Sequence, residues 1–142
     1  MGIDEAPFFV DYIRVIYNDT KESKIEEYAK DKISDLLLEK VKQSLDNNVI
    51  SRIELKNIKN DLGMTIFHEA GLSHIGIVDM YNDLIYYFCK NVKEKTLVAI
   101  SGYMFEMGMI CQDNNILYEI ITYFAKYGKQ YPYVTWIEDK GL

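Results

Sequence analysis

The chain of 142 residues contains 16 basic and 22 acidic residues, which give a formal net charge of −6. This length fits one domain, residues 1–142, that can bury a hydrophobic core. The acidic balance argues against nucleic acid as a partner, because phosphate contacts need a basic face. The opening residues MGIDEAPFFV do not resemble a signal peptide, and no apolar stretch reaches about 18 residues, so we expect a cytoplasmic protein without membrane contact.

The hydrophobic periodicity of the first half predicts helices. Residues 22–46 place their apolar side chains at the three-and-four spacing of one helix face, which predicts a long helix. The segment APFFVDYIRVIYND, residues 6–19, could form a helix with Pro7 in its first turn or a strand, and we prefer the helix. Two short helices are expected in NVISRIELKNIKNDLG and LGMTIFHEAG, the second ending at Gly71 as a left-handed cap.

Three further helices are predicted in the second half. Apolar stripes at helical spacing cover residues 77–89, 97–108 and 116–124, and the third stripe ends before Gly128. The segment 129–142 contains YVTWI, whose composition favours a short strand. Short connections between these elements indicate antiparallel neighbours. The sequence therefore predicts a mainly α fold, a compact single-domain antiparallel helical bundle or a short stack of helical hairpins, with a short strand near the C-terminus as an addition.

The stretch IFHEAGLSHIG contains both histidines of the chain, His68 and His74, around Glu69. A zinc protease motif needs two histidines four residues apart on one helix, whereas these lie six apart with Gly71 between them. A helix that ends at Gly71 and a new helix capped by Ser73 explain the same residues. We therefore expect no metal and no cofactor here, although a helical metal-dependent enzyme that uses these three residues is an alternative hypothesis.

No other motif indicates catalysis. Cys89 lies on the apolar stripe of its predicted helix, so it is expected to be a reduced core thiol, and Cys111 has no neighbouring histidine or cysteine. The glycine-rich signatures of nucleotide-binding loops are missing from the sequence. We therefore predict no catalytic residue and a protein that is not an enzyme.

The second half is poor in charge and rich in tyrosine. It holds nine of the 12 tyrosines, a residue type that is enriched at protein interfaces. If the three predicted helices stack side by side, each exposes an acid beside a tyrosine, and together they form one binding surface. The alternative is that these tyrosines belong to the rim of the core. The predicted partner-binding residues are Asp79, Asp83, Tyr86, Tyr103, Glu106, Glu119 and Tyr123.

A small acidic helical chain with such an acid-and-tyrosine face resembles bacterial toxin-immunity proteins, in particular those of contact-dependent growth inhibition and related polymorphic toxin systems. The resemblance is one of general character over the whole chain. It implies a cytoplasmic protein-binding inhibitor that neutralises a cognate toxin domain, often a basic nuclease. An acidic surface would speed encounter with such a partner. The alternative from another class is a small regulatory or scaffold subunit that associates with itself, for example as a homodimer.

Overall fold

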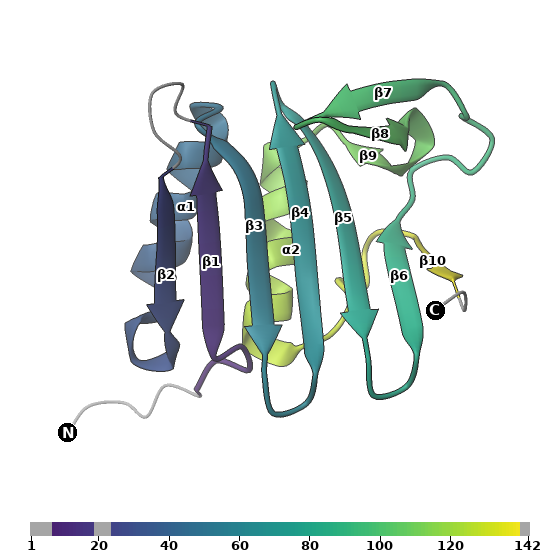
Figure 1. Cartoon of the computed structure of the whole chain (residues 1–142). Coiled ribbons are helices and arrows are strands. Elements are labelled where there is room, and N and C mark those ends of the chain that lie inside the picture. The colour runs from purple at the N-terminus through teal and green to yellow at the C-terminus, as the bar shows by residue number, and fades with distance from the viewer. Residues whose placement is uncertain (1–6, 19–23, 140–142) are drawn as a thin grey trace.

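An antiparallel sheet dominates the fold, which we describe from a computed structural model over residues 7–18 and 24–139 (Figure 1). The sheet has eight strands: seven follow the spatial order β10, β6, β5, β4, β3, β1, β2, and β9 pairs with β5. The strands of this sheet are β1 Tyr12–Tyr17, β2 Ile25–Ala29, β3 Ile50–Asn57, β4 Leu62–Glu69, β5 Leu72–Asp79, β6 Leu84–Phe88, β9 Ile110–Cys111 and β10 Trp136–Asp139. A separate hairpin consists of β7 Leu97–Ile100 and β8 Tyr103–Glu106.

Two α-helices, α1 Asp35–Asp46 and α2 Asn114–Tyr127, lie behind the sheet in Figure 1. Their apolar sides pack on every second residue of the central strands, as the two-residue period of a strand requires. Neither helix of the described residues is long and apolar enough to cross a membrane. The fully buried side chains of this layer include Ile13, Leu38, Leu45, Ile53, Leu55, Met64, Ile66, Ile75 and Phe124. The core therefore lies between the helices and one face of the sheet, and the other face is free of helices.

The predicted helical bundle is wrong, because most of the expected helices are strands. Residues 77–89 form the end of β5, a turn and β6, and residues 97–108 contain the β7–β8 hairpin. The helix expected over residues 22–46 exists only as α1, because Ile25–Ala29 pairs with β1 as an edge strand. The first described segment also contains a strand, Tyr12–Tyr17, where a helix was preferred. Residues 1–6, 19–23 and 140–142 lie outside the described part of the chain.

The third helix of the second half is present as predicted, and its ends follow the capping residues. The Asp113 carboxylate accepts hydrogen bonds from the backbone N–H groups of Asn115 and Ile116, at 2.8 and 3.3 Å. Gly128 closes α2 with φ of 67°, in the left-handed region that suits glycine. The Ser34 hydroxyl caps α1 in the same way, 3.1 Å from the Leu37 nitrogen. Local capping chemistry therefore determines where the two helices begin.

Candidate protein-binding surface

Two neighbouring turns at one end of the sheet carry exposed apolar side chains. The β3–β4 turn and the β5–β6 turn lie side by side at the lower end in Figure 1, and the Met80 N–H donates to the Asp61 carbonyl oxygen at 3.0 Å. Ile58 is 68% exposed, Met80 55% and Tyr81 85%. We call the set of Ile58, Asp61, Asp79, Met80, Tyr81 and Asp83 the turn-end surface.

The same five-residue turn occurs twice in this surface. The first turn is NIKND, residues 57–61, and the second is DMYND, residues 79–83. In each, the side chain of the first residue accepts a hydrogen bond from the backbone N–H three residues later, at 2.9 Å in the first turn and 3.0 Å in the second. The last residue of each is an aspartate with positive φ, 52° at Asp61 and 59° at Asp83. This shared geometry places Ile58 and Met80 at equivalent, outward positions.

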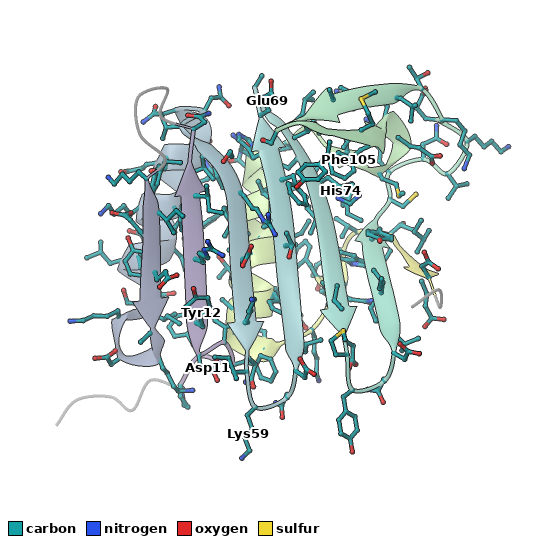
Figure 2. All side chains as sticks on the ribbon, viewed as in Figure 1. Asp11, Tyr12, Lys59, Glu69, His74 and Phe105 are labelled. Carbon is teal, nitrogen blue, oxygen red and sulfur yellow. The ribbon has the colours of Figure 1, made fainter. Side chains whose placement is uncertain are left out.

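The first turn is also held by the strand beside it. The Ile58 N–H donates to the Asp11 carboxylate at 3.1 Å, and Asp11 lies just before β1, near the turn that carries Lys59 at its tip (Figure 2). The Asp79 carboxylate is bound to the backbone and side chain of Asn82 in its own turn. These contacts fix the backbone of both turns, so the exposed apolar side chains start from defined positions.

The charge around the apolar side chains is negative. Asp61 and Asp83 are exposed and Asp79 is half-buried, whereas Lys59 is the one cationic side chain in the two turns. Three carboxylates against one ammonium leave a local excess of negative charge. This arrangement, large apolar side chains with acids beside them, is typical of a surface that binds a basic protein.

A groove of about 400 Å³ continues from the turns onto the face of the sheet that carries no helix. It is lined by Lys56 and Leu62 and, on β4 and β5, by Gly63, Thr65 and Val78. Gly63 contributes no side chain, which keeps the floor of the groove low, and a Cβ atom there would lie 3.3 Å from the Leu55 carbonyl oxygen. The turn-end surface is therefore contiguous with a concave region into which a partner's side chain could extend.

The opposite end of this sheet face is covered by the β7–β8 hairpin. The ring of Phe105 stacks on His74, with centroids 4.0 Å apart and planes 16° apart, and Tyr103 lies over Phe67 at 4.9 Å (Figure 2). Burial under this hairpin lowers the pKa of His74 to about 4. His74 is therefore neutral at physiological pH and contributes to packing.

Between the hairpin and the groove lies a buried carboxylate. Glu54 is only 5% exposed, although it belongs to the sheet face without helices. Three cations surround it: Arg52 Nε lies 2.9 Å, Lys56 Nζ 3.6 Å and an Arg14 guanidinium nitrogen 3.9 Å from its oxygens. This cluster neutralises the buried charge and is a structural feature of the sheet face.

The stretch IFHEAGLSHIG forms a β-hairpin, so the predicted helix end at Gly71 is wrong. Ala70 and Gly71 both have positive φ, 52° and 79°, as the two central residues of a tight hairpin turn require. His68 pairs with Ser73 in the register of β4 and β5, and His74 pairs with Phe67, so the two imidazoles point to opposite faces of the sheet. They cannot ligate one metal ion in this arrangement.

His68 belongs to a small polar network on the helix side. Its Nδ1 lies 2.7 Å from the Ser73 hydroxyl and its Nε2 3.2 Å from the Asn48 side-chain oxygen. Burial lowers the pKa of His68. Within residues 7–18 and 24–139, no group of three or more potential metal ligands lies together. Cys89 and Cys111 are buried free thiols, as predicted for Cys89, and burial raises the pKa of Cys111.

The seven predicted interface residues lie on four separate parts of the molecule. Asp79 and Asp83 belong to the turn-end surface. Tyr103 and Glu106 lie on β8 of the hairpin, and Glu119 and Tyr123 on α2 behind the sheet. Tyr86 pairs with Ile77 on the helix-covered face of the sheet and packs against the core. The single surface expected from three stacked helices does not form, because two of those helices are strand pairs.

Sequence reasoning missed the exposed apolar anchors Ile58, Met80 and Tyr81. The repeat of NIKND and DMYND, 22 residues apart, was the signal that could have indicated two equivalent turns. Comparison with protein-family models, with curated proteins and with solved structures gave no match to this chain.

Proposed function

We propose that the protein is a cytoplasmic protein-binding inhibitor of the toxin-immunity type, which binds a basic cognate toxin domain through the turn-end surface. The observation that carries the proposal is the exposure of Ile58, Met80 and Tyr81 together, with Asp61 and Asp83 beside them. Large exposed apolar side chains are costly in water unless a partner covers them. Their concentration in two adjacent turns supports a binding role for this end of the sheet.

The two kinds of side chain would act on different steps of binding. Tyr81 is the most exposed of the three anchors and can bury a large ring with little loss of rotamer freedom, which slows dissociation. The carboxylates would speed encounter with a basic surface, in a way that salt weakens. The repeated turn geometry holds both sets of groups in place before binding, which lowers the entropic cost of association.

The test is co-expression with the product of the open reading frame next to its gene, since immunity genes of the resembled type accompany the toxin gene. The proposal predicts that this neighbour inhibits growth when expressed alone, that the protein restores growth, and that the two chains co-purify. Tyr81→Ala is expected to weaken both effects. A neighbour that is harmless, or one that forms no complex with the protein, refutes the proposal.

A matched control separates the surface from general stability. Leu36 on α1 is 75% exposed, comparable to Tyr81, and does not belong to the turn-end surface. Leu36→Ala should leave rescue and co-purification unchanged. The alternative of self-association makes a different prediction: the protein alone would have the mass of a dimer in solution, and Tyr81→Ala would convert it to a monomer.

A further inference from the structure

Four tyrosines of α2 and the segment after it form a row, separate from the turn-end surface. In order along the row they are Tyr127, Tyr123, Tyr131 and Tyr133, and we call them the tyrosine row. Neighbouring ring centroids are 4.8, 5.8 and 5.4 Å apart, with interplanar angles of 61°, 68° and 68°. Each ring thus presents its edge to the next, which leaves alternating ring faces and gaps along the row.

The row is open to solvent and has a pocket beside it. Tyr133 is 83% and Tyr127 57% exposed. A cavity of about 260 Å³ lies beside the row, and the α2 residues that line it include Tyr118, Glu119 and Thr122. The Thr122 hydroxyl is buried and has no hydrogen-bond partner among the described residues. The pocket therefore offers a bound chain mainly the tyrosine rings and the Glu119 carboxylate.

Hydrogen bonds hold the row in one geometry. The Tyr131 hydroxyl donates to the Glu119 carboxylate at 2.8 Å, and the Trp136 indole N–H donates to the Tyr131 carbonyl oxygen at 3.0 Å. Lys126 also lines the pocket, but its ammonium lies 3.1 Å from the Asp35 carboxylate on α1. The Asp35 carboxylate thereby compensates the charge of Lys126. The Glu119 carboxylate supplies negative charge beside the tyrosine row.

We propose that the tyrosine row binds a proline-rich, arginine-containing segment of a partner protein in an extended conformation. The ring contacts run consecutively over four side chains, which fits an extended chain better than a compact cation. A polyproline II helix advances about 9 Å per turn, leaves its carbonyl oxygens free to accept hydrogen bonds, and docks its rings between aromatic side chains. Glu119 can pair with an arginine of the segment.

The test uses a short peptide of repeated Pro-Pro-Arg triplets as the probe. Trp136, the single tryptophan of the chain, is hydrogen-bonded to Tyr131 and reports binding through its fluorescence, since the peptide has no aromatic residue. The proposal predicts saturable binding that weakens as salt is added. Tyr127→Ala and Tyr133→Ala, at two exposed positions, should each weaken binding by about tenfold, and Glu119→Gln should reduce its salt dependence.

Two controls make the result decisive. A peptide in which alanine replaces every proline keeps the charge and loses the polyproline conformation, so it should not bind. Tyr81→Ala removes an exposed tyrosine from the turn-end surface and should leave peptide affinity unchanged, which keeps this proposal independent of the proposed inhibitor function. Absence of binding, equal binding of the alanine peptide, or loss of binding in Tyr81→Ala overturns the inference.

Discussion

Replacement of His74 by phenylalanine should remove a large part of the pH dependence of folding stability. His74 is buried under Phe105 and beside Tyr87, and burial lowers its pKa from an ordinary value of 6.5 to about 4. Because the folded-state pKa is the lower one, the unfolded chain binds the proton more readily between these values. Stability is therefore fully present above pH 6.5 and falls as the pH drops towards 4.

The size of this effect follows from the two pKa values. A displacement from 6.5 to about 4 corresponds to roughly 3 kcal/mol, because one pH unit of displacement is worth about 1.4 kcal/mol. Between pH 7 and pH 5 the His74 contribution to the free energy of unfolding should fall by about 2 kcal/mol. His68, whose pKa is also lowered, contributes in the same direction in both proteins and cancels in the comparison.

Urea denaturation of the wild type and of His74→Phe at these two pH values measures the difference. The phenyl ring can keep the stack with Phe105 and cannot be protonated. We expect the variant to lose about 2 kcal/mol less than the wild type on acidification. Equal losses in the two proteins, or an imidazole of His74 that titrates near 6.5 by NMR, would show that the hairpin does not bury this side chain.

Three other predictions concern stability and can be checked by thermal or urea unfolding. Gly108→Ala would place a Cβ atom 1.9 Å from the Asn91 carbonyl oxygen, so it should cost more than about 3 kcal/mol or prevent folding. In Gly102→Ala the new Cβ atom has no neighbour within 4 Å, so the variant should lose only about 1 kcal/mol of stability, because of the positive φ. Equal losses of stability in the two glycine variants would refute the close approach at Gly108. Asp113→Ala removes the cap of α2 and should cost about 1 kcal/mol, whereas Asp113→Asn keeps an acceptor and should cost less. Glu54→Gln leaves three cations without their carboxylate and should lower the free energy of unfolding by about 1 kcal/mol. An unchanged free energy of unfolding would show that the cluster is fully solvated.

The helix predicted over residues 77–89 shows why the sheet was not recognised in the sequence. Within this segment the β6 residues Leu84–Tyr87 are all half-buried, on both faces of the strand. The alternation of apolar and polar residues that marks a half-buried strand is therefore lost. Tyr81, in the turn between β5 and β6, also lies at a sequence spacing that continues the apolar stripe of a helix.

At α2 a local signal agreed with the periodicity, whereas at Gly71 the same signal belongs to a hairpin turn. Gly128 located the end of α2 correctly, since a C-terminal cap acts within a few residues of the helix end. The β-branched and aromatic residues of the first segment indicated a strand, which is present as β1. Of the predicted interface residues, Asp79 and Asp83 share one surface and Glu119 and Tyr123 another. A common surface could not be predicted, because it depends on long-range strand pairing.

The most direct test of the turn-end surface is the affinity of the purified protein for the product of the neighbouring open reading frame, measured by calorimetry. The account predicts that Tyr81→Ala weakens binding by about tenfold or more, and that Leu36→Ala, with a similarly exposed side chain on α1, leaves it unchanged. Asp61→Asn and Asp83→Asn, which keep a residue that tolerates positive φ, should lower the association rate and its salt dependence. Wild-type affinity in Tyr81→Ala would contradict the account.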